Sequence, residues 1–318
     1  MVGYARRCLR NLLFGPGFDS PHLHYMFFYN VPTKNIIKSK RSVSNLEVEF
    51  TKMSGAGNDF VIIDNRLEVI QDKPAFARKI CDRHWSIGAD GVLLLESSDK
   101  AAYRMMYYNA DGSYGGMCGN GGRCIAMFAC LKNIANSRHT FEALDHIYSA
   151  SVDTEIVSLL MKNPLSLKLN QHILIEKKHI SYHAIDTGAP HIIIDIKEFS
   201  KNINFDEFDV QKWGKKLRWQ KKFAPAGTNV NFIKIIGENV VQVRTFERGV
   251  EDETLACGTG SIASAIIAYK KWKLNRPITV IPTSKIPLAV DFDEVGKEIQ
   301  NVTLKGPATI TFTGRLDV

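Results

Sequence analysis

The stretch Met117-Cys-Gly-Asn-Gly-Gly122 recurs 139 residues later as Ala256-Cys-Gly-Thr-Gly-Ser261. After each copy comes an almost entirely apolar segment, residues 123–132 and 261–272, which predicts a buried helix that begins directly after the cysteine. A lone Cys-Gly-x-Gly before a helix is more often a turn that holds a small buried residue. Two copies in matched places reverse that interpretation and indicate that both cysteines have a chemical role.

Two further pairs of segments repeat in the same order along the chain. Residues 55–64 resemble 186–195, and residues 88–95 resemble 227–234. Ordered repeats at a nearly constant spacing are typical of a duplicated unit, and short β-rich runs bounded by Gly, Asn or Asp lie within them. We therefore predict an α+β fold of two pseudo-symmetric halves. Each half is a curved, mainly antiparallel sheet wrapped around a central buried helix, and the active site lies in the cleft between the halves.

The predicted N-terminal half covers residues 46–165 and the C-terminal half covers 166–307, with a last strand, 308–318, that can cross back to the first half. Residues 1–45 form a basic extension with seven Lys or Arg against the single acid Asp19, whereas the whole chain has a net charge of +8. We interpret this extension as a disordered tail or a segment that is not native; its composition also fits an organellar transit peptide.

The rest of the chain carries 34 basic and 32 acidic side chains, so its charge gives no reason to expect a nucleic-acid partner. No stretch reaches the roughly 18 apolar residues of a membrane-spanning helix. The six cysteines form no C-x-x-C pair and accompany no secretion signal, which indicates free thiols rather than disulfides or a metal site. We expect a cytoplasmic protein that binds a small molecule, without metal, membrane or nucleic acid.

A cysteine at a helix N-terminus lies beside free backbone N–H groups and the positive end of the helix dipole. This setting predicts a thiol pKa lowered from ~8.5 to roughly 7. Two such thiols at close range favour a state with one thiolate and one thiol. That state suits a two-base inversion, in which Cys118 and Cys257 remove and deliver a proton on opposite faces of one carbon. Cys81, Cys124 and Cys130 lack this setting. Cys124 and Cys130 lie on the apolar helix and are predicted as core residues, and Cys8 falls in the extension.

From about residue 49 to its C-terminus the chain resembles the diaminopimelate epimerase family. The resemblance rests on residues 52–60, 108–113 with 117–124, 187–191, and 246–249 with 256–260. It implies interconversion of LL- and meso-diaminopimelate without pyridoxal phosphate or any other cofactor, on the route to lysine and peptidoglycan precursors. It also implies a homodimer.

The resemblance assigns roles to individual residues. It implies that Cys118 and Cys257 are catalytic and that His191 and Glu247 tune their pKa values. Arg248 is expected to clamp a distal carboxylate, and Glu247 to face an ammonium group. The full set of substrate-binding positions that it implies is Asn58, Asn109, Gly119, Asn120, Asn229, Glu247, Arg248, Gly258 and Thr259.

Two departures from the family pattern concern substrate preference. Many members have Asn where Ala189 stands and Gln where Gly91 stands, so one or two hydrogen bonds to the substrate are missing or replaced. The carboxylates Asp59, Asp90 and Asp111 are predicted as turn or capping residues.

Two other functions remain open on sequence grounds. A proline or hydroxyproline racemase-like enzyme would share the two-cysteine chemistry, although Glu247, Arg248 and the asparagines suit a longer substrate that is charged at both ends. A thiol-redox or ligand-binding protein would use Cys118 and Cys257 as a switchable disulfide instead.

Overall fold

The structure is a computed structural model that describes residues 47–317. The predicted extension, residues 1–45 with Cys8, lies outside the described residues. Within them, no helix is long and apolar enough to cross a membrane.

The N-terminal half is a mixed sheet whose strands follow one another in chain order. β2 pairs with β1 antiparallel and with β3 parallel, β4 pairs with β3 antiparallel and with β5 parallel, and β5, β6 and β7 form an antiparallel meander. The elements are β1 (Glu47–Gly55), β2 (Asn58–Asp64), α2 (Lys73–Cys81), β3 (Gly91–Glu96), β4 (Arg104–Asn109), α3 (Gly119–Leu131), β5 (Arg138–Ala143), β6 (His146–Asp153) and β7 (Ile156–Leu160).

The C-terminal half repeats this order of pairings. β10 pairs with β9 antiparallel and with β11 parallel, β12 pairs with β11 antiparallel and with β14 parallel, and β14, β15 and β16 are antiparallel. The elements are β8 (Leu165–Ile175), β9 (Lys178–Asp186), β10 (Pro190–Asp195), η1 (Ile196–Glu198), α4 (Val210–Arg218), η2 (Lys221–Phe223), β11 (Asn229–Ile235), β12 (Val240–Glu247), β13 (Asp252–Thr254), α5 (Gly258–Trp272), β14 (Ile278–Ile281), β15 (Leu288–Val295) and β16 (Glu298–Pro307). The predicted duplicated α+β fold is confirmed.

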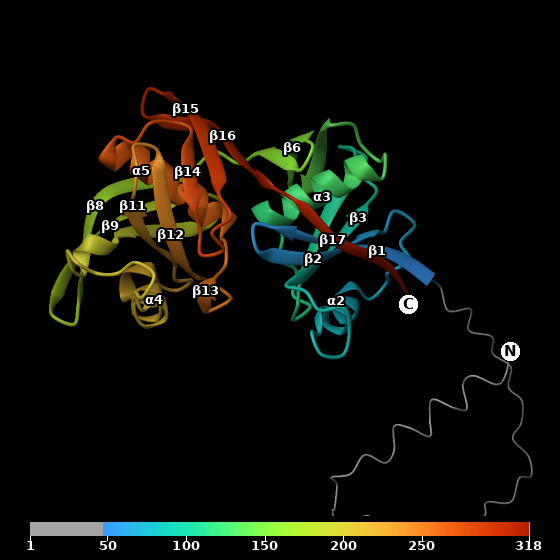
Figure 1. Cartoon of the computed structure of the whole chain (residues 1–318), viewed down its shortest axis with the longest axis horizontal. Coiled ribbons are helices and arrows are strands. Elements are labelled where there is room, and N and C mark those ends of the chain that lie inside the picture. Colours follow the sequence, from blue (N-terminus) through green and yellow to red (C-terminus); the bar gives the residue numbers. More distant parts are fainter. Residues whose placement is uncertain (1–46, 318) are drawn as a thin grey trace, which may run out of the picture. The chain divides into compact units, whose positions relative to one another are not determined.

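Strand exchange ties the two halves together. The matched strands β7 and β16 pair antiparallel. β16 then leads into β17 (Thr309–Asp317), which lies antiparallel beside β1 at the other end of the chain (Figure 1). In the same way, β7 leads into β8, which pairs with β9. Each half is therefore completed by a strand that follows from the other half, and the described strands form a single 17-stranded sheet.

The helices α3 and α5 consist almost entirely of apolar residues, and both are therefore buried along most of their length. α3 contacts β1, β2, β6 and β7, and α5 contacts β10, β11, β12 and β14. The largest apolar cluster runs through both helices and includes Ile125 and Ile266. α2 and α4 belong to two smaller clusters. Because burial on this scale fixes a helix against its sheet, it also fixes the cysteine that precedes it.

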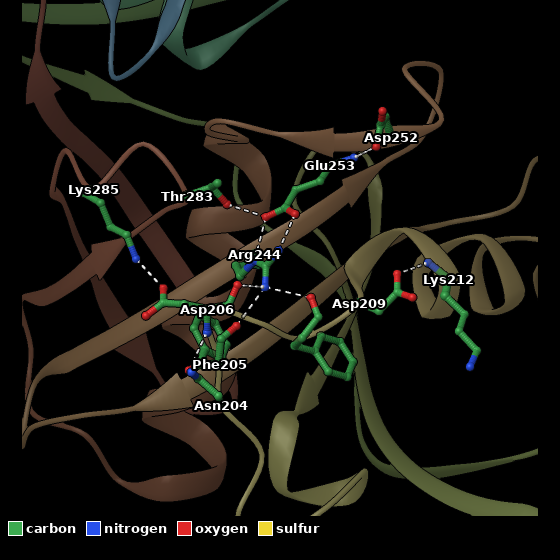
Figure 2. A network of polar contacts seen from close by, with 11 residues as sticks. Asn204, Phe205, Asp206, Asp209, Lys212, Arg244, Asp252, Glu253, Thr283 and Lys285 are labelled. Carbon is green, nitrogen blue, oxygen red and sulfur yellow. Dashed lines mark hydrogen bonds and ion pairs between the residues drawn. The ribbon is translucent and has the colours of Figure 1, made fainter.

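A partly buried arginine holds the hairpin of β12 and β13 to its surroundings (Figure 2). Arg244 on β12 donates to both carboxylate oxygens of Glu253 on β13, from Nε at 2.7 Å and from Nη2 at 2.6 Å. Its Nη1 donates to the backbone carbonyls of Phe205, Asp206 and Phe208. Such a bidentate, charge-assisted pair is among the stronger polar contacts in proteins. It stiffens a hairpin whose first strand ends at Glu247 and whose second strand lies shortly before Cys257.

Replacing this arginine is expected to destabilise the fold. Arg244→Met removes five hydrogen bonds, two to Glu253 and three to carbonyl oxygens, and leaves the Thr283 hydroxyl to pair with Glu253. The free energy of unfolding should therefore fall by about 3 kcal/mol. Urea denaturation measures the loss. Lys285→Met is the control, because its pair with Asp206 is exposed and should contribute less than about 1 kcal/mol. Equal losses in the two variants would contradict the role given to Arg244.

Candidate active site

The N-termini of α3 and α5 touch through the glycines that follow the two cysteines. A Cβ atom placed on Gly258 would lie 3.5 Å from Cα of Gly119, and one placed on Gly119 would lie 3.8 Å from Cα of Gly258. Both would also meet Cδ2 of Leu304 at 3.0–3.3 Å, which is a tight contact. Cys118 and Cys257 are the N-cap residues of these helices. The structure therefore brings together the two cysteines that the duplicated motif predicted.

The surroundings of Cys257 combine helix amides with burial. Its Sγ accepts from the Gly260 N–H at 3.4 Å and lies 3.5 Å from Oγ1 of Thr259. The residue is only 7 % exposed. Burial raises the pKa of the Cys257 thiol, the negative charge of Glu247 raises it further, and the Thr259 and Gly260 contacts oppose this only in part.

Cys118 shows the same competition. Burial raises the pKa of its thiol, and the charge of Glu247 adds to this, while the N–H groups of Gly121 and Asn120 lower it. The prediction that both thiol pKa values are lowered by the helix N-termini is therefore wrong. Removing a thiolate from water costs more free energy than a few amide donors return.

His191 on β10 belongs to a buried relay of hydrogen bonds that ends at Cys257. Thr245 donates to Oδ1 of Asn231 at 2.9 Å, which leaves the Asn231 amide to donate to Nδ1 of His191 at 3.1 Å. The Nε2–H of His191 then donates to Oγ1 of Thr259 at 3.0 Å. The Thr259 hydroxyl proton is thus free to point at the Cys257 sulfur. Asn231 completes this relay, and the sequence analysis missed it.

Glu247 stands at the end of β12, where it influences both thiols. Its Oε2 accepts from the Thr254 hydroxyl at 2.8 Å, and a hydrogen bond from Cys257 also lowers its pKa. Burial outweighs these two contacts and raises the pKa of the carboxyl group overall. Glu247 and Cys257 therefore interact, and the pKa-tuning role that the resemblance implies for Glu247 stays a prediction.

Arg248 follows Glu247 and is anchored through its backbone. The Arg248 N–H donates to Oδ1 of Asn229 at 2.8 Å, and the Asn229 amide donates to the Pro190 carbonyl at 3.0 Å. Asn229 thus fixes the loop that carries the arginine. Among residues 47–317 the Arg248 guanidinium forms no ion pair, and its charge helps to lower the pKa of His191.

In the N-terminal half, Asn58 and Asn120 are joined to each other and to the opposite half. The Asn120 amide donates to Oδ1 of Asn58 at 2.5 Å and to the carbonyl of Ala256 at 3.0 Å. Ala256 directly precedes Cys257, so this contact links the first turn of α3 to the second cysteine. Asn58 in turn donates to Oδ2 of Asp90 at 3.1 Å.

The carboxylates beside Asn58 do more than the sequence predicted. Asp59 and Asp90 accept each other's backbone N–H groups, as capping residues do. They also share the guanidinium of Arg83, and Asp59 forms an ion pair with the buried Lys52 at 2.8 Å. Although burial opposes it, the contacts with Arg83 and Lys52 lower the pKa of Asp59 to about 2. Asp111 has only the predicted turn role, because it accepts from Ser113 two residues later.

The remaining predicted positions lie at the edge of this network. The Asn109 amide donates to the Ser113 hydroxyl at 2.9 Å, which ties it to its own turn. At Gly91 the room for a longer side chain is taken by the Tyr107 ring, which a Cβ atom would meet at 2.5 Å. The same ring lies 2.3 Å from a Cβ placed on Gly115. The Tyr107 ring therefore occupies the space that a glutamine side chain at position 91 would need.

One surface cavity, of about 310 Å³, is lined by residues of β8, β9 and β10, among them His191, and by the loop 223–228. Another, of about 440 Å³, is lined by residues of β5, β6, β7 and β16. Neither cavity is lined by Cys118 or Cys257. Among residues 47–317, no three His, Cys, Asp or Glu side chains are arranged to hold a metal ion.

Solved structures of low sequence identity share the fold. A probable proline racemase from Agrobacterium radiobacter K84 has a TM-score of 0.66 at 15 % identity, over 85 % of this chain and 92 % of the other. A hydroxyproline epimerase from Agrobacterium vitis has a TM-score of 0.64 at 12 % identity, over 86 % and 93 %. These likenesses define the fold alone.

Sequence comparison gives the family. The family model described as diaminopimelate epimerase matches residues 50–157 and 183–311. A diaminopimelate epimerase of Chlorobaculum tepidum is 41 % identical over 83 % of this chain and 99 % of its own. One from Flavobacterium psychrophilum is 39 % identical over 82 % and 97 %. The chain belongs to the diaminopimelate epimerase family, a family of isomerases.

His191 should remain neutral across the physiological pH range, since burial and the nearby Arg248 charge lower its pKa to about 3. NMR of the imidazole should show no titration between pH 5 and 8. In the unfolded chain the same histidine takes up a proton near pH 6.5, so its contribution to stability is present above that pH and is lost as the pH falls towards 3. His191→Gln should flatten this part of the stability profile. An imidazole that titrates near pH 6.5 would contradict the assignment.

Proposed function

We propose that this protein interconverts LL- and meso-diaminopimelate by a cofactor-independent, two-base mechanism. The observation that supports it best is the contact between two cysteine-capped helix N-termini, at Gly119 and Gly258, in a member of this family. In this proposal the reaction serves the synthesis of lysine and of peptidoglycan precursors.

The two thiols divide the inversion between them. One cysteine, as thiolate, takes the α-proton from one face of the carbon, and the thiol of the other delivers its proton to the opposite face. After one turnover the protonation states of Cys118 and Cys257 are exchanged, so the reverse reaction starts from the other thiolate. The N–H groups of the first turns of α3 and α5 stabilise the substrate carboxylate and the carbanion between the thiols. These groups include the backbone of Gly119, Asn120, Gly258 and Thr259.

Because both thiol pKa values are raised, something must favour the thiolate form of one cysteine. In this proposal the bound substrate does so. Glu247 raises the pKa of both cysteines through its negative charge. An ammonium group of the substrate placed beside Glu247 compensates that charge and favours a thiolate once the site is loaded. The enzyme then forms its base mainly in the presence of substrate.

We assign the distal end of the substrate to three asparagine side chains and to Arg248. Asn58, Asn109 and Asn229 offer donors and acceptors that suit a carboxylate and an ammonium group. The Arg248 guanidinium can bind a carboxylate in the bidentate way. Tyr107, packed between Gly91 and Gly115, lies on the same face of β4 as Asn109. The homodimer, the cytoplasmic location and the absence of nucleic-acid and membrane partners stay predictions.

Cysteine replacement tests the two-base mechanism. In heavy water, the wild type should incorporate deuterium at the α-carbon of LL-diaminopimelate and form the meso isomer. Because inversion needs both groups, Cys118→Ala and Cys257→Ala should each lower epimerisation by at least about 1,000-fold, within the range of losses seen when a catalytic acid–base group is removed. Cys130→Ala is the control, since that thiol lies at the far end of α3. Retained epimerisation in either site variant would refute the mechanism and leave a redox role for the thiols.

Substrate comparison tests the specificity. The kcat/KM for diaminopimelate should exceed that for L-proline by at least about 10,000-fold, because buried polar groups left unpaired by the smaller ligand oppose its binding. Polarimetry or chiral chromatography follows both reactions. Comparable rates on the two substrates would identify the protein as a racemase of broader specificity.

A further inference from the structure

Arg123 is fully buried next to the site, and the proposed mechanism gives it no role. Arg123, on the second turn of α3, donates to the carbonyl of Gly119 at 3.3 Å, to Oδ1 of Asn120 at 2.9 Å and to the carbonyl of Pro307 at 3.4 Å. No carboxylate among residues 47–317 forms an ion pair with it. A buried charge without a counter-ion is unfavourable, so its presence calls for an explanation.

The fold itself does not require an arginine at this place. The matched position on α5, at the same spacing of 139 residues that relates the two cysteines, is Ile262. Ile262 is also buried, at the same turn of an equivalent helix. One half of the duplicated fold therefore accommodates an apolar side chain where the other half holds a cation. The difference points to a task that only the N-terminal half performs.

The contacts of Arg123 set the orientation of an amide that joins the two halves. A guanidinium has only donors, so the Asn120 atom that faces it must be the oxygen. The Asn120 nitrogen is then turned towards Oδ1 of Asn58 and the carbonyl of Ala256. With the amide reversed, both contacts would set an acceptor against an acceptor. Arg123 thus holds the first turn of α3 against the residue that precedes Cys257.

The charge of Arg123 also reaches the nearer thiol. Cys118 faces the Glu247 carboxylate from β12, which raises its pKa, and the Arg123 cation within α3, which lowers it. Cys257, Tyr107 and Cys124 are the other titratable groups that interact with Cys118, and Cys124 also interacts with the guanidinium. Within this set Arg123 is the cation that offsets the charge of Glu247 at Cys118.

We propose that Arg123 is a positioning residue of the reaction: by fixing the Asn120 amide it aligns the two cysteine-bearing helix N-termini, and its charge favours the Cys118 thiolate. The role in aligning the helix N-termini rests on the function proposed above. The effect of the Arg123 charge on the Cys118 thiolate can be measured without any turnover.

The test compares Arg123→Met with Ile262→Met, its matched control on α5. Arg123→Met should fold with an unchanged or higher Tm, because an apolar side chain replaces an unpaired buried charge. Its kcat on LL-diaminopimelate should fall by about 100-fold with a much smaller change in KM, as expected when reacting groups are misplaced by about 1 Å. Ile262→Met should retain wild-type kcat. Arg123→Lys keeps the charge but cannot donate to the same three oxygen atoms in the geometry of a guanidinium, so its kcat should remain low.

The second readout follows Cys118 alone. In Cys257→Ala protein, alkylation of Cys118 by iodoacetamide is measured against pH by peptide mass spectrometry. Adding Arg123→Met should move the midpoint up by about one pH unit, and adding Arg123→Lys should restore it. Wild-type kcat in Arg123→Met, or a lowered Tm and kcat with an unmoved midpoint, would overturn the proposal in favour of a purely structural arginine. A moved midpoint in a protein that epimerises no diaminopimelate would support the charge effect and refute the proposed function instead.

Discussion

The contact between the N-termini of two buried helices is the constraint on which the site depends. Gly119 and Gly258 lie against each other and against Leu304, at distances that leave little room for any larger side chain. Because α3 and α5 are packed along most of their length, this contact cannot shift without disturbing the core. The residues before the glycines are the two cysteines, so core packing determines where the thiols stand.

The same burial decides how acidic those thiols are. Helix amides stabilise a thiolate, yet desolvation and the Glu247 charge outweigh them at both Cys118 and Cys257. Since thiolates are the form that reacts with oxidants, raising both thiol pKa values slows oxidation of the cysteines. The electrostatic role of Glu247 thus extends to both halves, although it hydrogen-bonds to only one of the cysteines.

The two halves share one duplicated scaffold but differ in the residues that surround their cysteines. On the Cys257 side, Thr259 receives a hydrogen bond from a neutral His191, whose tautomer is set by Asn231. On the Cys118 side, the matched position is Asn120, and the buried Arg123 donates to it from the next turn of α3. Burying an unpaired guanidinium costs several kcal/mol in stability. The exchanged strands β8 and β17 and the clamp around Arg244 help to offset such costs by tying the halves and the β12–β13 hairpin into one sheet.

The sequence by itself determined the duplicated α+β fold, the two cysteines and their helices, because repeats and apolar periodicity can be recognised in short stretches of sequence. It also supplied Glu247, His191 and the asparagines through the family resemblance. Only the tertiary structure decided that the thiol pKa values rise, that Asp59 and Asp90 share Arg83, and that Tyr107 fills the space beside Gly91. It alone brought Asn231 to His191 and turned Asn120 towards Ala256. Desolvation and amide orientation depend on neighbours distant in sequence, and no local pattern encodes them.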